Sequence, residues 1–217
     1  MKFSIELRAR ASQVQSIEQK HDLFVQRLAE VPPPWGLDKT RLPPAPDAGS
    51  QLVASFNLGT FLGKMAKGHV FYQFRRTFRD AASDDDFIDL TFNATKIDFR
   101  TLACDVFPRY IAAFEPYVGA IAHDDFSIKD YDALRTLRFD ARHIVYRISQ
   151  VSFFDALLCE RAFQLSPEKV AEKLNGVVEH TQLISGGILI IGSSRPLSLE
   201  DADRLSREWR QLLPGPG

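Results

Sequence analysis

The chain contains short groups of residues that could bind a nucleotide. The stretch 59–64 (Gly-Thr-Phe-Leu-Gly-Lys) is one residue too short for a phosphate-binding loop, and Met65 stands where a magnesium-binding hydroxyl is needed. Gly186, Gly187 and Gly192 flank an apolar strand instead of linking a strand to a helix, so they do not form a dinucleotide fingerprint. The sequence therefore predicts no nucleotide cofactor.

Metal and nucleophile patterns are missing as well. The 5 histidines are scattered without a paired HxxxH spacing, and the 2 cysteines form no CxxC motif. The serines at 193–194 follow a glycine at a strand end, but the sequence Gly-Ser-Ser-Arg-Pro breaks the pattern of a nucleophile elbow. We therefore expect no metal, no cofactor and no local catalytic motif.

An active site would have to be assembled from distant segments. The candidates are His143, Asp155 and Cys159, which lie around a predicted strand–helix junction at 143–159. A cysteine acts as a nucleophile only where a cation or a helix N-terminus lowers its pKa, and the local sequence of Cys159 shows neither. An enzyme of this kind is one alternative function.

A second alternative is nucleic-acid binding through residues 71–79. This segment interleaves aromatic rings with Arg75, Arg76 and Arg79, which are the ingredients of a platform for single strands. The whole chain carries 27 basic and 28 acidic residues, so it has no net field that would attract a polyanion. The composition thus argues against a nucleic-acid partner, and an amphipathic segment with buried rings also explains the pattern.

Protein recognition is the leading hypothesis for the remaining polar clusters. The acidic group at 84–89 lacks the spacing of a calcium loop, and charge patches of both signs on a nearly neutral protein suit recognition of another protein. Trp35 lies in a proline-rich loop at 32–50, whose order the sequence leaves open, and tryptophan is frequent among binding hot spots. The residues predicted to contact a protein partner are Asp84, Asp85, Asp86, Asp89 and Trp35.

The elements that would position these residues predict an α+β fold. Alternating apolar residues indicate strands, and helical spacing with capping residues indicates helices. Expected strands are 3–7, 51–57, 87–92 and 144–148, and expected helices are 14–31, 98–114 with a kink or restart at Pro108, and 152–163. Strands 177–184 and 188–193 form a hairpin, followed by a helix capped by Ser198. Because strands and helices do not alternate strictly, we predict a mainly antiparallel sheet backed by helices.

Size and composition are those of a globular protein. The 217 residues, 45% of them apolar, predict a single domain over 1–217, with a subdivision into 1–122 and 133–217 as the alternative. The first residues lack the apolar core of a signal peptide, and the longest apolar run, 187–192, is too short to span a bilayer. We expect a cytoplasmic protein with no membrane association, and the oligomeric state stays open.

The segment 142–159 (Arg-His-Ile-Val-Tyr-Arg-Ile-Ser-Gln-Val-Ser-Phe-Phe-Asp-Ala-Leu-Leu-Cys), with the hairpin and the final helix through Leu213, resembles a family of bacterial proteins. These are the immunity proteins that neutralise polymorphic or secreted toxins. The resemblance implies a cytosolic α+β protein without catalytic residues that occludes the active site of a partner toxin. We therefore expect a non-enzymatic, toxin-neutralising binding module.

Overall fold

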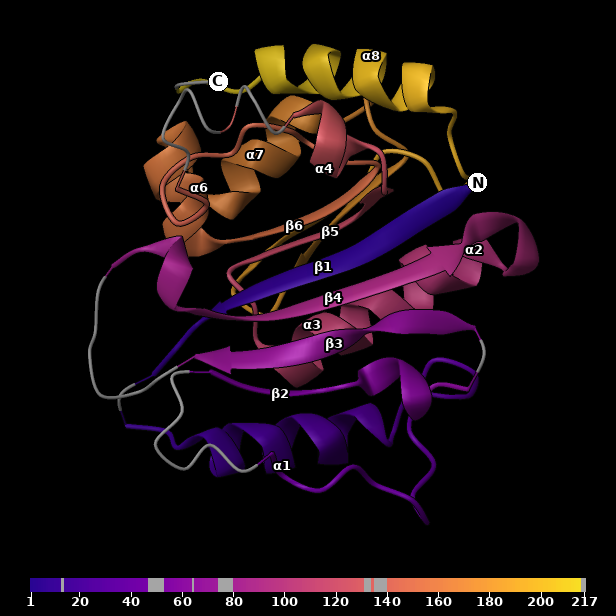
Figure 1. The fold of residues 1–217 in the computed structure, drawn as a ribbon. Coiled ribbons are helices and arrows are strands. Elements are labelled where there is room, and N and C mark those ends of the chain that lie inside the picture. The colour runs from indigo at the N-terminus through magenta and orange to yellow at the C-terminus, as the bar shows by residue number, and fades with distance from the viewer. Residues whose placement is uncertain are drawn as a thin grey trace.

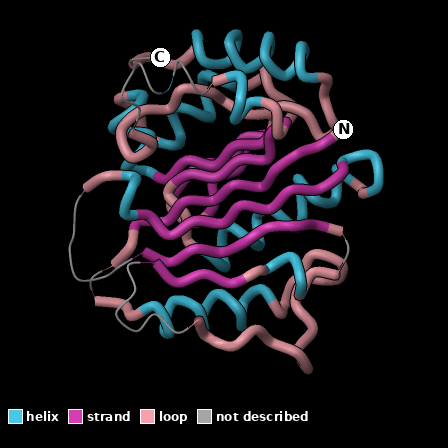
Figure 2. The backbone as a smooth tube through the Cα atoms, viewed as in Figure 1, coloured by secondary structure: helices cyan, strands magenta, loops and turns pink. Residues whose placement is uncertain are grey.

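The computed structural model describes residues 1–12, 14–46, 53–63, 65–73, 80–130, 134 and 140–215 of the chain. Within these residues the centre is one eight-stranded sheet, in which all neighbouring strands are antiparallel, in the order β2-β3-β4-β1-β5-β6-β8-β7 (Figure 2). The strands are β1 Lys2–Arg10, β2 Val53–Phe56, β3 Ala66–Gln73, β4 Asp85–Asn93, β5 Val118–His123, β6 Val151–Asp155, β7 His180–Ile184 and β8 Gly187–Ile191. The predicted α+β fold with a mainly antiparallel sheet is confirmed.

Helices back this sheet at both ends of the strand order (Figure 1). They are α1 Ile17–Leu28, α2 Phe99–Thr101, α3 Phe107–Phe114, α4 Phe126–Lys129, α6 Ala156–Phe163, α7 Pro167–Leu174 and α8 Leu199–Gln211, with short 3-10 turns at Leu58–Thr60, Ala82–Asp84 and Ala94–Lys96. The predicted hairpin and the final helix capped by Ser198 are both present. None of the helices in the described ranges has the length and apolar character needed to cross a bilayer.

Two clusters of buried apolar side chains lie on the two faces of the sheet. The first packs α1 and α3 against β1, β3 and β4, and the second packs α6, α7 and α8 against β6 and β8. Strands β6 and β8 serve both clusters, because Phe153 and Leu189 point into the first and Phe154 and Ile188 into the second. Because both faces of β6 and β8 are buried, these two strands contribute side chains to both hydrophobic clusters.

This two-sided burial explains an error in the predicted elements. Residues 144–150 form no strand, and the helix predicted to start at Ser152 begins instead after Asp155, whose carboxylate accepts a hydrogen bond from Leu158 N–H at 2.7 Å. Residues 151–155 form β6 between β5 and β8. A strand that is buried on both faces loses the polar–apolar alternation by which strands are recognised, so tertiary pairing overrides the local pattern.

The predicted break at Pro108 takes the form of a π-helical segment. Residues Leu102–Val106 lie between α2 and α3, and Pro108 is in the first turn of α3. Proline has no N–H to donate and its ring crowds the carbonyl one turn earlier, which disfavours a regular α-helical turn there. The helical path continues across the proline with a locally wider turn.

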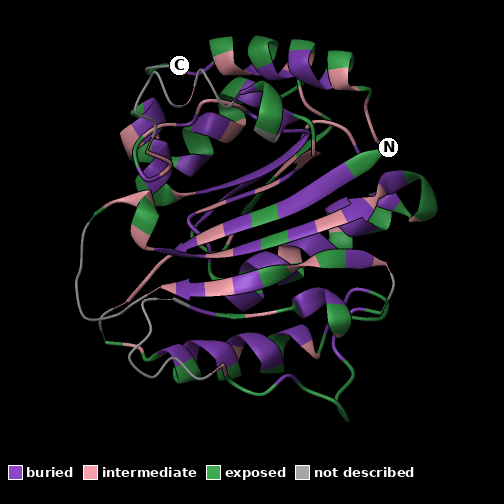
Figure 3. Ribbon diagram, in the orientation of Figure 1, coloured by how far each residue is buried: buried purple, intermediate pink, exposed green. Residues whose placement is uncertain are grey.

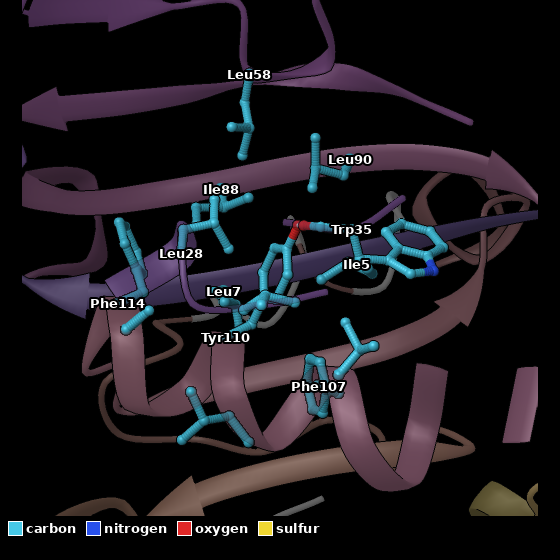
Figure 4. Close-up of a cluster of buried hydrophobic side chains, with 14 of the residues drawn as sticks. Ile5, Leu7, Leu28, Trp35, Leu58, Ile88, Leu90, Phe107, Tyr110 and Phe114 are labelled. Carbon is cyan, nitrogen blue, oxygen red and sulfur yellow. The ribbon is translucent and has the colours of Figure 1, made fainter. Parts of the chain in front are cut away.

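Trp35 belongs to the first core and does not lie on the surface, which corrects its predicted role as a partner anchor. Its side chain is 4% exposed and lies among the apolar side chains of the first core (Figure 4). It packs edge-on against Phe92, with ring centroids 5.4 Å apart. Its carbonyl accepts a hydrogen bond from the Tyr110 hydroxyl at 2.7 Å. The described part of the proline-rich segment, residues 32–46, is therefore held against α3 and β4 through this residue.

His21 holds the same segment further along. Its side chain is 1% exposed, with Nε2 at 3.0 Å from the Pro43 carbonyl oxygen and Nδ1 at 3.2 Å from the Tyr72 hydroxyl. A neutral ring satisfies both contacts, since Nε2–H donates to Pro43 and Nδ1 accepts from Tyr72. Burial lowers the pKa of His21 from its ordinary value of 6.5, against smaller opposing effects of Pro43 and Asp22.

We expect His21 to make stability depend on pH. The unfolded chain binds a proton near pH 6.5 and the folded chain resists it, so the free energy of unfolding should fall as the pH drops below about 6.5. A His21→Gln variant should lose less stability than the wild type between about pH 7.5 and 5.5 in urea denaturation. The exposed His180→Gln is the control and should keep the wild-type pH dependence. An unchanged dependence in His21→Gln would contradict this assignment.

Candidate functional site

One face of the sheet has no helix over β3, β4 and β1 within the described residues, as Figure 1 and Figure 3 show. Side chains alternate along a strand, so each of these strands gives one row of residues to the first core and the other row to this face. We call it the open face. It is formed by Lys67, His69 and Phe71 of β3, Phe87, Asp89 and Thr91 of β4, and Ser4, Glu6 and Arg8 of β1.

An aromatic row crosses the open face. Phe71 and Phe87 are opposite each other across β3 and β4, and their half-buried rings stack with centroids 4.4 Å apart and an interplanar angle of 17°. The Arg8 guanidinium, on the next strand, lies over the Phe87 ring at 5.4 Å from the centroid. Aromatic rings and arginine are the side chains that most often carry binding energy at protein interfaces.

A second row, one step along the strands, places two carboxylates together. The register sets Asp89 directly opposite Glu6 on one side and His69 on the other, and all three side chains are exposed. Like charges directly opposite each other destabilise an antiparallel pair. The open face therefore carries two like-charged carboxylates, Glu6 and Asp89, opposite each other.

The surroundings of these carboxylates raise the pKa of both. Loss of water around Glu6 is the larger cause for that residue, followed by the charge of Asp89. For Asp89, loss of water and then the charge of Asp124 raise the pKa, while His69 and Lys2 lower it less. The Lys2 ammonium is held by Asp124 at 2.6 Å. An ammonium or guanidinium group from another molecule could relieve the repulsion and lie against the neighbouring rings.

Of the four predicted aspartates, the structure brings only Asp89 to the open face. Asp84 is half-buried at the end of a 3-10 turn, where its carboxylate accepts a hydrogen bond from the Ser83 hydroxyl at 3.0 Å. Asp86 is buried and accepts a hydrogen bond from Gln73 N–H at 2.9 Å. Asp85 is also buried. The prediction that Asp85 and Asp86 contact a protein partner directly is therefore corrected, because both side chains lie inside the protein. Consecutive residues of a strand point to opposite faces, which separates Asp86 from Asp89, whereas Asp85 lies on the same face as Asp89 but is covered by Arg142 and Tyr117.

Asp85 is the centre of a buried polar network. Both Asp85 and Arg142 have completely buried side chains; Arg142 Nε donates to Asp85 Oδ1 at 2.8 Å, and Nη2 lies 2.7 Å from the same oxygen. The Tyr117 hydroxyl donates to Asp85 Oδ2 at 2.6 Å. Burial, followed by the charge of Asp85, raises the pKa of Tyr117, so the phenol keeps the proton that it donates.

Asp80 extends this network toward the surface. Its carboxylate lies 3.2 Å from Arg142 Nη1 and 3.0 Å from Arg161 Nη2 of α6, with His143 Nε2 at 3.7 Å. The hydrogen bond from Arg161 is the main cause that lowers the pKa of Asp80. The network ties the start of β4, the residues before β6 and helix α6 to one another.

The three residues of the enzyme hypothesis each have separate local contacts. His143 is exposed and faces Asp80, whereas Asp155 caps α6 and pairs with Arg10 at 2.5 Å. Cys159 is buried with Sγ at 3.9 Å from the Phe154 carbonyl oxygen, and burial raises the pKa of its thiol to about 12. The thiol is therefore protonated at neutral pH, which makes it a poor nucleophile.

Two further expectations concern nucleic acids and metals. Arg75, Arg76 and Arg79 of the predicted nucleic-acid platform lie outside the described residues. Among the residues that the structure does describe, no three or more His, Cys, Asp or Glu side chains gather in a way that could hold a metal ion.

Sequence reasoning named Asp89 but not Glu6, Phe71 and Phe87, which share the open face with it. The alternation of the predicted strand at 3–7 does place Glu6 on the face opposite Phe3, Ile5 and Leu7, so half of the signal was present. That Glu6 faces Asp89 depends on the register of β1 with β4, two strands separated by most of the N-terminal half of the chain.

No protein-family model matches this chain, and no curated protein matches it significantly. Among solved structures, the chain is similar to the Pseudomonas aeruginosa T6SS protein PA0821, with a TM-score of 0.54 and 11% sequence identity. The similarity covers 97% of this chain and 72% of that chain. At this identity the likeness is one of fold.

We expect neutral substitutions on the open face to stabilise the free protein. The raised pKa values mean that folding disfavours the charged forms of Glu6 and Asp89 relative to the unfolded chain, so Glu6→Gln and Asp89→Asn should each raise the free energy of unfolding at pH 7, by no more than about 0.5 kcal/mol because solvent screens charges at these exposed positions. The double variant should gain less than the sum, because either change removes the same repulsion. Urea denaturation measures this, with the exposed Glu160→Gln as control. Destabilisation by either change would contradict the assignment.

We expect the buried network to be sensitive to loss of one charge. Arg142→Met leaves Asp85 buried without its cation and should lower the free energy of unfolding by about 3–5 kcal/mol. Adding Asp85→Leu to Arg142→Met should recover part of the loss, since no uncompensated charge then remains. Arg204→Met, which removes two exposed ion pairs on α8, should change the free energy of unfolding far less than Arg142→Met. Equal losses for Arg142→Met and Arg204→Met would show that the network is not needed.

Proposed function

We propose that this chain is a non-enzymatic binding module that acts as a cytoplasmic immunity protein and neutralises a toxin by occluding it. The observation that carries the proposal is the open face, where the carboxylates of Glu6 and Asp89 lie opposite each other beside the stacked rings of Phe71 and Phe87. A partner that presents a basic side chain to this face would find both a charge to neutralise and an apolar surface to cover.

The proposal has an energetic basis. Natural proteins break local stability rules mainly at functional sites, and stabilising changes at such sites often cost function. The register places the Glu6 and Asp89 carboxylates opposite each other, and the charge of Asp89 contributes to the raised pKa of Glu6, so a cation between the two carboxylates would add an attractive contact to each. The same acidic pair would repel a polyanion, which disfavours nucleic acid as the partner of this face.

The fold comparison is compatible with this role. The protein of similar fold is a T6SS protein, and toxin-neutralising proteins belong to systems that secrete toxins. The resemblance of segment 142–159 and the C-terminal elements to immunity proteins supports the same assignment. The partner that we propose is therefore a toxin with a basic surface around its active site.

The experiment uses the product of the gene adjacent to the one that encodes this chain, purified as the binding probe. We expect a stable complex, and charge reversal by Asp89→Lys should weaken it at least ten-fold, or about 1.4 kcal/mol, in calorimetric titration. Restoration of the adjacent protein's toxicity in cells that express the variant is the second readout. The matched control is Glu200→Lys, an exposed acid on α8 far along the chain from the open face.

The possible outcomes separate the site from the function. A complex that forms but tolerates both Asp89→Lys and Glu6→Lys would move the binding surface elsewhere while leaving the immunity role in place. Absence of any complex, together with unchanged toxicity of the adjacent gene product, would overturn the immunity role itself.

A further inference from the structure

Strand β7 forms one edge of the sheet and pairs only with β8 in the described part of the chain. The two strands are joined by the two-residue turn Ser185-Gly186, in which both residues have positive φ, 48° and 70°. Such a turn makes the flanking residues, Ile184 and Gly187, a hydrogen-bonded pair. The backbone groups of alternate residues of β7 therefore point toward β8, and those of Thr181 and Leu183 point outward.

The outward groups of Thr181 and Leu183 are left open. Across the described residues, no hydrogen bond from outside the hairpin reaches the N–H or C=O of either residue. Backbone N–H and C=O groups form strong hydrogen bonds wherever a partner is present. A row of unpaired donors and acceptors at a sheet edge can therefore template another strand.

The edge also lacks the features that normally prevent strand addition. Natural edge strands carry charged side chains, prolines or bulges, and β7 (His-Thr-Gln-Leu-Ile) has no Lys, Arg, Asp, Glu or Pro and pairs with β8 without interruption over its five residues. Leu183 is 52% exposed beside this edge. An uncharged, regular edge strand with unpaired backbone groups is a site at which another strand can pair.

We propose that β7 pairs with β7 of a second copy of this chain, antiparallel and centred on Gln182. In that register Thr181 lies opposite Leu183 of the partner subunit and Leu183 opposite Thr181 of the partner subunit, which satisfies all four outward groups of each copy. The register is self-complementary, as a two-fold interface must be. No like charges meet, because the strand carries none.

Gln182 lies on the two-fold axis of this pairing. Its own backbone groups bond to β8, so it forms a non-hydrogen-bonded pair with its symmetry mate, the arrangement in which side chains approach most closely. The amide donors and acceptors of the two glutamine side chains complement each other. An extended strand of another protein would use the same backbone groups but would not place Gln182 against a second Gln182. Substitutions at Gln182 therefore distinguish pairing with a second copy of this chain from pairing with another protein.

The pairing leaves the open face free. Three strands, β5, β6 and β8, separate β1 from β7 in the sheet. A two-fold axis perpendicular to the sheet relates two antiparallel edge strands, so it carries both open faces to the same side of a continuous sheet. The inference does not depend on the proposed function and needs no toxin to test.

Sedimentation velocity of the full chain over a range of concentrations tests this interface. We expect a wild-type dimer, and we expect Gln182→Lys and Gln182→Glu each to weaken it roughly ten-fold or more, since like charges then meet on the axis. An equimolar mixture of the two variants should dimerise again, because the charges on the axis are now opposite. Recovery by mixing also shows that both variants are folded.

The controls are Gln211→Lys and Gln211→Glu, which place the same charges on exposed α8 and should dimerise like the wild type. A wild-type chain that stays monomeric at the highest attainable concentration overturns the proposal. Dimers that persist in both Gln182 variants, or variants that fail to recover on mixing, overturn it as well, since either result places the interface elsewhere.

Discussion

The buried ion pair of Arg142 with Asp85 is the interaction on which the arrangement of the molecule depends. It joins the first residue of β4 to the irregular residues before β6, and Tyr117 brings the start of β5 into the same contact. Burial of two charges is tolerated only where each satisfies the other, so the pair admits few alternative positions for these segments. Asp85, Arg142 and Tyr117 lie where β4 begins, next to the open face.

A second network of the same kind holds the C-terminal helix. Arg147 makes two hydrogen bonds to Asp130 and one to Asp203 of α8, all at 2.7–2.8 Å, and Lys129 binds Asp203 as well. The hydrogen bond from Lys129 is the largest cause that lowers the pKa of Asp203 to about 2. Both networks use the residues around 140–150 as the connector, which explains how a segment without regular structure can be held firmly between a sheet and two helices.

The charged side chains of the open face are arranged differently from those of the two buried networks. Inside the molecule every carboxylate of these networks meets a cation, whereas Glu6 and Asp89 meet each other on a surface that no described helix covers. The first arrangement stabilises the fold, and the second weakens it. This contrast, more than any single residue, distinguishes the surface that we assign to recognition from the charges that serve the structure.

The sequence by itself determined the elements whose signals are local: the strand at 3–7, the strand at 87–92 that forms most of β4, the β7–β8 hairpin, the capped α8 and the break at Pro108. Each rests on turn chemistry, capping or alternation within a few residues. Only the tertiary structure decided that Trp35, Asp85 and Asp86 are buried, that 151–155 is a strand, and that Glu6 faces Asp89. These outcomes follow from which strands become neighbours and in which register, and a one-residue shift of register would send every side chain of a strand to the other face.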